Sequence, residues 1–354
     1  MNFARRFSFN NERPYIHKRK ADVDNVILRM ALEGELKTMN ATRIKRKVMG
    51  MLSPDEESED TSFPARFLRF ANSKKESTRE IYLHTYGRIS AYMGKKLNDL
   101  KFEDITKEWL TGFDRFLQRT SPSKNARNIH LRNIRAVFNE AIDDEVTTFY
   151  LFRRFKIRPV ATAKRSLSVQ RLRDLFAFPV QDCQLQYLDM FKLIFFLIGI
   201  NTIDLLNLKE IKEGRIEYHR SKTGRFYSIK IEPEAMAIIS KYKGRKFLLD
   251  VLDRYANYKD YVRWLNRNLQ RIGYTDIGKH GKKTIQPLFP AITTYWARHT
   301  WATIAASLDI PKETIAAALG HGGNTVTDIY INFDQKKVDE ANRRVINWVL
   351  YGKK

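Results

Sequence analysis

Two long stretches of helical periodicity, separated by a basic stretch that has none, constrain the fold of this chain most. The separating stretch is FKIRPVATAKRS, residues 155–166, which contains a proline and no regular spacing of apolar residues. Apolar residues recur at helical spacing again from about residue 163, and before the break in FPARFLRFANS, STREIYLHTYGRISAYMG, TKEWLTGFDRFLQR and SKNARNIHLRNIRAVFNEAID. The pattern predicts two mainly α-helical domains with an exposed linker between them.

The N-terminal part differs from both domains. Residues 1–20 are basic and aromatic without a period, helical spacing follows over residues 24–51, and the acidic stretch SPDEESED interrupts it at residues 53–60. A length of 354 residues also exceeds one typical core. We therefore expect three parts: a basic arm and helix in residues 1–60, a helical domain in residues 61–162 and a second domain in residues 163–354.

Local signals predict where several elements begin. Ser77 with Glu80 is a capping-box pattern that predicts a helix start, and Ser168 is expected to cap the first helix of the second domain. The most apolar run, residues 190–200, predicts a buried helix. GRIEYHR and RFYSIKI alternate around the turn SKTG, which predicts an antiparallel strand pair. The expected fold class is mainly α, with a small antiparallel sheet in the second domain.

The chain carries a large excess of positive charge, with a formal net charge of +24 and a sequence pI near 9.9. Its basic residues are spread over nearly the whole length, so several surfaces would face a polyanion. Double-stranded DNA is the favoured partner, and a membrane surface is the weaker interpretation. Around residue 130 an apolar stripe leaves a set of cations for phosphate contacts, or alternatively for a solvated helix face: Lys124, Arg127, Arg132 and Arg135.

Other classes of protein are excluded or disfavoured. The single cysteine, Cys183, excludes an internal disulfide and a cysteine-based zinc site, and the histidines show no metal-ligand spacing, so no metal is assigned. The N-terminus lacks the apolar core of a secretory signal. The apolar run at residues 190–200 is too short to span a bilayer and is interrupted by Lys192. These observations predict a cytoplasmic protein.

The last third of the chain contains the segment TTYWARHTWATIAASLDIPKETIAAALGHGGNTVTDIYINF. An arginine, the triplet LGH and a tyrosine follow each other in it: twenty-two residues separate Arg298 from His321, and eight separate His321 from Tyr330. In these residues and spacings the chain resembles the tyrosine recombinases, or phage-type integrases. The resemblance covers the second domain well and the helical domain before it more loosely.

The resemblance implies a fold and a function. The fold is a helical SAM-like core-binding domain followed by a mostly helical catalytic domain, and residues 1–60 would be a reduced arm-site segment. The function is site-specific DNA recombination, in which Tyr330 attacks phosphorus and forms a 3′-phosphotyrosyl bond. Arg298 and His321 donate to the phosphate oxygens, and Lys222, in the turn of the strand pair, is the general acid. No cofactor is implied, because the covalent link conserves the bond energy.

Two positions depart from the family. Asn201, in FFLIGINTIDLLNLKE, stands where the first catalytic arginine is expected, and Tyr295 stands three residues before the arginine of the motif, where histidine is commonest. A neutral amide supplies no charge, and a phenol is a poor base at neutral pH. We therefore hypothesise that Arg220 or Arg225, on either side of the turn, compensates.

Two neighbours of the motif positions are expected to have supporting roles. Asp204 occupies the position of the family's common acidic residue and is expected to orient its neighbours, while His299 is expected to hold the site through hydrogen bonds. With its first arginine replaced, the chain looks most like integrases of conjugative transposons and related mobile elements of the Bacteroides group.

The resemblance also implies partners. Two domains would clamp duplex DNA, and a homotetramer would exchange strands on two sites through a Holliday junction, with accessory DNA-bending proteins allowed. The protein would be bacterial and associated with the nucleoid when bound. The C-terminal segment VDEANRRVINWVLYGKK would form an amphipathic helix that packs into a neighbouring protomer or onto its own domain.

Two alternative functions stay open. One is a type IB topoisomerase-like activity, which uses the same nucleophile on a monomer. The other is a DNA-binding protein with weakened or lost catalysis, which Asn201 and Tyr295 favour.

Overall fold

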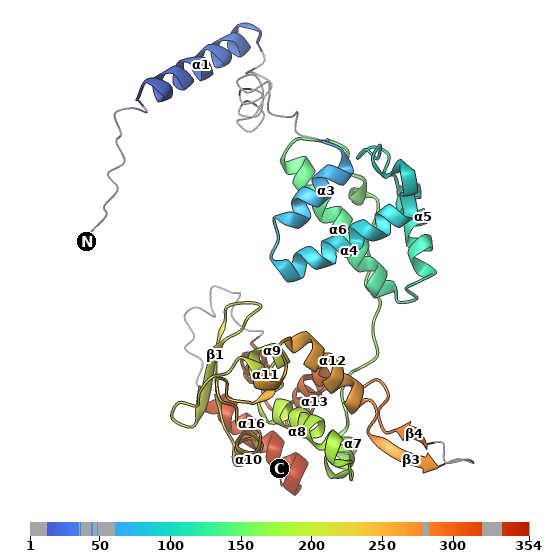
Figure 1. Ribbon diagram of the computed structural model, residues 1–354, viewed down its shortest axis with the longest axis vertical. Helices are drawn as coiled ribbons and strands as arrows, with labels where there is room; N and C mark the ends of the chain where they lie inside the picture. Colours follow the sequence, from blue (N-terminus) through green and yellow to red (C-terminus); the bar gives the residue numbers. More distant parts are fainter. Residues whose placement is uncertain are drawn as a thin grey trace. The chain divides into compact units, whose positions relative to one another are not determined.

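The computed structural model of the 354-residue chain describes residues 13–34, 36, 44, 48, 61–277, 283–320 and 335–353, with side chains from Lys18 onward except that of Arg19. Contacts between residues divide the chain into two compact units, Met1–Thr162 and Ala163–Lys354. Both consist mainly of helices (Figure 1), so the predicted mainly α fold is confirmed. None of the helices in the described ranges is long and apolar enough to cross a membrane.

The first helix, α1, spans Arg13–Leu32. It begins earlier than the apolar spacing predicts, because the lysines and arginines of residues 13–20 have good helix propensity. It also ends earlier, because Gly34 lies at φ 76°, in the left-handed region that terminates helices. Most of the predicted segment that follows, up to residue 60, lies outside the described residues.

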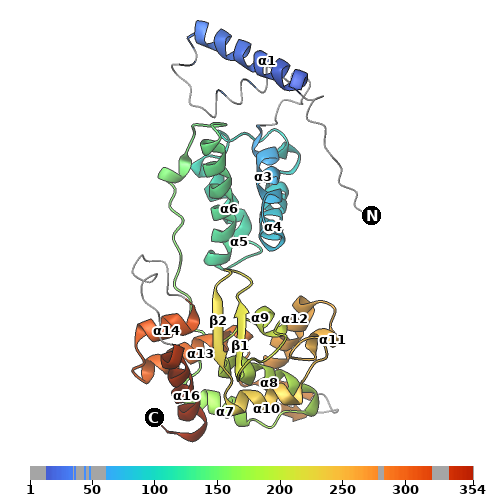
Figure 2. The ribbon, with the colours of Figure 1, turned by 90° about the vertical axis from the view of Figure 1, so that its left-hand side faces the viewer.

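The rest of the first unit is a bundle of helices joined by short loops. Its elements are α3 (Phe63–Asn72), α4 (Glu76–Met93), the 3₁₀ helix η2 (Gly94–Leu97), α5 (Lys107–Gln118), α6 (Lys124–Asp143) and the 3₁₀ helix η3 (Leu151–Arg153). Figure 2 shows α3 and α4 beside α5 and α6. In the core, ring centroids lie 5.2 Å apart between Phe63 and Phe102, and 5.0 Å apart between Phe102 and Phe138.

Side-chain caps begin several of these helices. The capping residues accept a hydrogen bond from the backbone N–H three residues later, and they are Ser62, Thr106 and Ser123. The predicted helix start at Ser77 is wrong. The helix α4 begins at Glu76, because the Lys75 carbonyl already accepts the N–H groups of residues 78 and 79. Ser77 is therefore inside the first turn, where its side chain cannot serve as the N-cap.

A buried arginine joins α3 to α6. Arg66 is 1% exposed, donates to Glu140 at 2.9 Å and also donates to Asp144. Arg69 reaches the same two carboxylates from the surface. Because a charge in the core must be neutralised, the two helices are held in one relative position.

The segment 155–166 has no regular secondary structure, as predicted. Its first half is tied to α6, because the Asn125 side chain pairs with the backbone of Val160 at 2.6 and 2.9 Å, and Asn128 donates to the Arg158 carbonyl at 2.9 Å. Among the described residues, the linker therefore has no hydrogen bonds to α6 after Val160.

The second unit is built around α8 (Asp182–Phe196), the buried helix that its apolar residues predict. The other helices are α7 (Val169–Ala177), α9 (Thr202–Leu206), α10 (Pro233–Lys241), α11 (Val251–Arg254), α12 (Tyr258–Leu269), α13 (Thr294–Ser307), α14 (Lys312–Leu319) and α16 (Gln335–Tyr351). Helices α10, α12 and α13 pack against α8. Ser168 caps α7 as predicted, by accepting from the Arg171 N–H.

Two antiparallel hairpins complete this unit. They are β1 (Arg215–His219) with β2 (Phe226–Lys230), and β3 (Gly273–Ile277) with β4 (Lys283–Pro287). The first is the predicted strand pair. The second differs from the expectation of one small sheet, because nearly all its side chains are exposed and no alternation of apolar and polar residues marks it.

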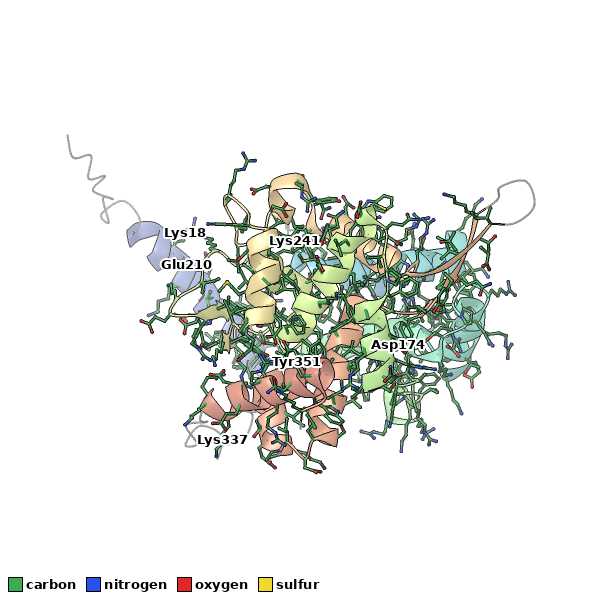
Figure 3. The ribbon with its side chains drawn as sticks, turned by 90° about the horizontal axis from the view of Figure 1, so that it is seen from below. Lys18, Asp174, Glu210, Lys241, Lys337 and Tyr351 are labelled. Carbon is green, nitrogen blue, oxygen red and sulfur yellow. The ribbon has the colours of Figure 1, made fainter. Side chains whose placement is uncertain are left out.

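The last helix, α16, packs within its own unit. Its buried residues are Val338, Ala341, Asn342, Val345, Ile346 and Val349. Arg343 forms ion pairs with Glu232 at 3.0 Å and Glu234 at 2.9 Å, and the Tyr351 hydroxyl donates to Glu234 at 2.8 Å. Figure 3 shows Tyr351 at the end of this helix, on the face of the unit that also carries Lys241 of α10. Of the two packings left open for the C-terminal segment, the structure has the one on its own domain.

Candidate active site

Arg298 lies in α13 and is 7% exposed. Its Nη1 donates to the Gly199 carbonyl at 3.1 Å, and its Nη2 donates to the Leu319 carbonyl. The guanidinium thus joins the turn after α8 to the end of α14. In the part of the chain that the structure describes, no carboxylate pairs with it, so its charge faces only neutral acceptors.

The turn after α8 has a strained backbone. Ile198 and Gly199 both lie in the left-handed region, at φ 57° and 68°. This conformation is costly for a β-branched residue, and Ile198 is buried in it. At Gly199 a Cβ atom would meet the Cα and Cβ atoms of Arg298. The strained turn therefore brings a main-chain carbonyl directly against the arginine.

Asn201, two residues after this turn, faces an arginine from the first hairpin. With its amide oriented so that Oδ1 points to Arg220, Asn201 accepts hydrogen bonds from Nη2 at 2.9 Å and from Nε at 3.1 Å. Arg225 is half-buried, and its carbonyl accepts from the Arg220 N–H at 2.8 Å. Two arginines were expected to compensate. In the described residues, Arg220 is the one whose side chain contacts Asn201.

The register of the hairpin explains how Arg220 reaches this position. Side chains two residues apart on a strand share a face. The inner row runs through Ile216 opposite Ile229 and Tyr218 opposite Tyr227, and it continues to Arg220 and Arg225. Figure 2 shows this hairpin between α9 and the group of α13, α14 and α16 in that view. The same alternation that buries the isoleucines therefore turns the arginines inward.

Lys222 lies in the turn of the hairpin and is exposed. The residue before it is held by Asp204, which is 4% exposed and accepts from the Ser221 N–H at 2.9 Å and from the Ser221 hydroxyl at 2.7 Å. Two bonds to one buried carboxylate fix the start of the turn. Asp204 therefore orients its neighbours, as expected, while the ammonium of Lys222 stays in solvent.

Tyr295 is 46% exposed and lies one helical turn before Arg298. Its ring meets the ring of His299 edge to face, with centroids 4.7 Å apart and planes at 87°. Burial and the charges of Arg165 and Arg298 lower the pKa of His299, which favours the neutral imidazole. Among the described residues His299 holds the site through this ring contact, and not through the side-chain hydrogen bonds expected of it.

His321 and Tyr330 lie outside the described residues. The described residues on either side of them are both anchored to β2. The Leu319 carbonyl accepts from the Tyr227 hydroxyl at 3.0 Å, and Gln335 donates to the carbonyl of the residue after Tyr227 at 2.9 Å. Leu319 and Gln335 are therefore both held by the same hairpin.

The four cations of α6 differ in their surroundings. Arg127 is 5% exposed, and its guanidinium donates to Asp114 at 2.9 Å and to the carbonyls of residues 121 and 122 at 2.9 and 2.8 Å. This is a structural role, because its donors are already bound inside the unit. Lys124 lies 3.2 Å from the same carboxylate. Arg132 is exposed and Arg135 half-buried, and within the described residues neither is ion-paired.

A groove between α4 and α6 adds groups that sequence reasoning missed. It is lined in part by Ile81, His84, Arg88, Ile129 and His130. Ile129 is 40% exposed, although its spacing assigns it to the buried stripe. The rings of His84 and His130 lie 5.3 Å apart, and burial with the nearby charges of His84 and Arg88 lowers the pKa of His130 to about 4. In the sequence, the signal that could have indicated this groove was the spacing of His84 and Arg88, which lie one helical turn apart.

Known proteins are similar to both units of this chain. Residues 64–157 match the family model described as the phage integrase SAM-like domain. Among solved structures, a lambda integrase dimer bound to a COC′ core site is similar with a TM-score of 0.55 and 15% identity, over 77% of this chain and 98% of that chain. A lambda integrase tetramer bound to a Holliday junction is similar with a TM-score of 0.54 and 15% identity, over 82% and 86%.

A Tn1549 transposon integrase in complex with transposon right-end DNA is similar with a TM-score of 0.53 and 14% identity, over 80% of this chain and 98% of that chain. The search of curated protein sequences finds no match. At this level of identity the likeness is one of fold. The chain therefore has the fold of the lambda and Tn1549 integrases, and its residues 64–157 match the phage integrase SAM-like domain.

Proposed function

We propose that this chain is a site-specific DNA recombinase, an integrase that cuts and rejoins strands through a 3′-phosphotyrosyl intermediate and a Holliday junction. The observation that carries the proposal is the environment of Arg298, a buried cation that faces only neutral carbonyls among the described residues. A buried charge without a counter-ion is stabilised when an anion binds beside it. We assign a DNA phosphate as this anion. The lambda integrase structure is bound to a COC′ core site, and the Tn1549 integrase structure is in complex with transposon right-end DNA.

Each motif residue then has a role in phosphoryl transfer. The guanidinium of Arg298 has more N–H donors than the two carbonyls take up, and the rest form hydrogen bonds to the non-bridging oxygens. Lys222 gives the proton to the leaving sugar oxygen from its exposed turn. His321 adds a donor, and Tyr330 attacks the phosphorus. The last two assignments rest on the spacing of the motif.

Arg220 supplies the positive charge that Asn201 lacks. The support for this is the contact between them, since an amide oxygen holds a guanidinium without neutralising it. The role of Asn201 is then to position Arg220. Tyr295, which is 46% exposed, donates a hydrogen bond to a phosphate oxygen where the family more often has histidine.

The first unit grips the DNA backbone. Arg132, Arg135 and Lys124 on α6 contact phosphates, and the net charge of +24 supports a large footprint on DNA. One lambda integrase structure is a tetramer bound to a Holliday junction. We extend this arrangement to the present chain, as a homotetramer on two sites, with accessory DNA-bending proteins as further partners.

The parts of the chain divide this work. Residues 1–60 are an arm segment, residues 61–162 the core DNA-binding domain and residues 163–354 the catalytic domain. The division of contacts after Thr162 and the SAM-like match over residues 64–157 support these limits. Asn201 in place of an arginine supports an origin in a Bacteroides-type mobile element, hence a bacterial cytoplasmic protein that acts on the nucleoid.

A trapping experiment tests the proposal. The full chain is incubated with nicked suicide duplexes taken from the DNA that flanks its coding region, which release a short strand after cleavage. The wild type is expected to form a covalent protein–DNA adduct, and Tyr330→Phe is expected to bind the duplex without forming it.

Other outcomes support the alternatives. If the wild type binds the duplexes but forms no adduct, the chain is a DNA-binding protein with lost catalysis. If it forms the adduct and relaxes supercoiled plasmid as a monomer, without exchanging strands between two sites, it is a type IB topoisomerase.

A further inference from the structure

The carbonyl of Leu319 is a meeting point of two side chains. It accepts one hydrogen bond from the hydroxyl of Tyr227 at 3.0 Å and another from Nη2 of Arg298. Tyr227 lies in β2 and is 8% exposed. Because a carbonyl oxygen has two lone pairs, both bonds form at once, and each limits the direction of the other.

Gly320, the next residue, leaves the space that the tyrosine fills. It ends α14 in the left-handed conformation, with φ 65° and ψ 35°. A Cβ atom at this position would meet the hydroxyl and the ring of Tyr227. The glycine of the LGH triplet is therefore needed both for the backbone conformation and for the close approach of the phenol.

The ring of Tyr227 is fixed in turn by the hairpin. It stacks on its cross-strand partner Tyr218, with centroids 5.2 Å apart and planes at 14°. The same strand pair leads to Arg220 and to the turn that carries Lys222. A shift of the hairpin would therefore move the phenol and, through the Leu319 carbonyl, one of the two carbonyls that hold the Arg298 guanidinium.

We propose that Tyr227 is a positioning residue for strand cleavage: its hydroxyl holds the Leu319 carbonyl and thereby directs the guanidinium of Arg298 toward the scissile phosphate. The inference rests on the proposed function, because it concerns the same phosphate. Without the hydroxyl, the Leu319 carbonyl loses one of its two hydrogen-bond donors. The carbonyl can then shift, and the guanidinium of Arg298 loses its alignment. Since small misplacements of donors slow a reaction without weakening overall binding, the loss falls on the rate.

The test compares Tyr227→Phe with Tyr242→Phe on a suicide duplex that the wild type cleaves. Tyr242 is a matched control, because its hydroxyl also donates to a buried partner, Asp189 of α8 at 2.8 Å, and not to the carbonyl that holds Arg298. Single-turnover experiments at saturating protein separate the rate constant of adduct formation from its amplitude. Dissociation constants for the duplex and melting temperatures are measured alongside.

The expected result is a rate constant about tenfold lower for Tyr227→Phe, with amplitude and DNA affinity within about twofold of the wild type. Tyr242→Phe should keep the wild-type rate constant. An unchanged rate constant in Tyr227→Phe would overturn the inference and leave the proposed function intact. A loss of amplitude and melting temperature at an unchanged rate constant would overturn it too, because it would reveal a purely structural role. If the wild type forms no adduct on any duplex, both the function and this inference fail.

Discussion

Among the described residues, carboxylates neutralise the buried arginines of the first unit but not the buried arginine of the second. Arg66 and Arg127, in the first unit, are 1% and 5% exposed, and both pair with carboxylates. Arg298, in the second, is 7% exposed, and its partners within the described residues are two main-chain carbonyls. Where a carboxylate neutralises a buried arginine, the residue supports the fold. Where only neutral acceptors hold it, the remaining charge is available to an anionic ligand.

Replacing Arg298 should have the largest effect on activity. Arg298→Ala is expected to lower the rate of adduct formation by about 10²–10³ or more, because it removes a preorganised cation from the transition state. Its effect on the free energy of unfolding should be smaller than that of Arg66→Ala, since no carboxylate among the described residues loses an ion-pair partner. Single-turnover cleavage and urea denaturation measure the two effects. If unfolding is affected as strongly as in Arg66→Ala, Arg298 is a structural residue and the contrast fails.

Replacing Arg66 should have the largest effect on stability. Arg66→Ala removes a fully buried side chain and its bonds to Glu140 and Asp144, which are partly exposed and keep Arg69, so the free energy of unfolding should fall by about 2–5 kcal/mol. Arg69→Ala is the matched control, because it removes an exposed cation from the same carboxylates and should cost about 1 kcal/mol or less. Equal losses in the two variants, measured by urea denaturation, would show that burial does not set the strength of these pairs.

The two hairpin arginines sharpen the account of the second unit. Arg220→Ala should slow cleavage by about 10–100-fold, because it removes a cation beside Asn201. Arg225→Ala should change the rate by about threefold or less, since no contact joins its side chain to Asn201 in the described structure. Single-turnover rates on one duplex check both values. If Arg225→Ala lost more of the cleavage rate than Arg220→Ala, the compensating charge would belong to Arg225.

The last prediction concerns the pH dependence of stability in the first unit. The pKa of His130 is lowered to about 4 by burial, His84 and Arg88, whereas an unfolded histidine has a pKa near ~6.5. As the pH falls below about 6.5 the unfolded chain binds a proton that the folded chain does not, so stability decreases until the pH reaches about 4. Unlike an arginine, this buried group can lose its charge. Denaturation at several pH values should show a shallower decrease in His130→Asn, and identical slopes would contradict the assignment.

Features that depend on neighbouring residues could be predicted from the sequence. The hairpin follows from alternation around SKTG, and the cap of α7 from Ser168, because a strand face and a cap are decided within a few residues. Ser77 shows the limit of such signals, since α4 begins one residue before it. The unpredicted β3–β4 hairpin shows another limit, because exposed strands carry no burial pattern.

By itself the sequence determined the mainly helical class, the strand pair around SKTG and the motif that contains Arg298. The tertiary structure decided which side chains meet. It paired Arg220 with Asn201, bound Arg127 inside the first unit, and joined Tyr227 to the carbonyl that holds Arg298. The physical reason is that a hydrogen bond requires two groups within about 3 Å and correctly aligned. Between residues far apart in the sequence, only the packing of several helices and a hairpin can provide that alignment.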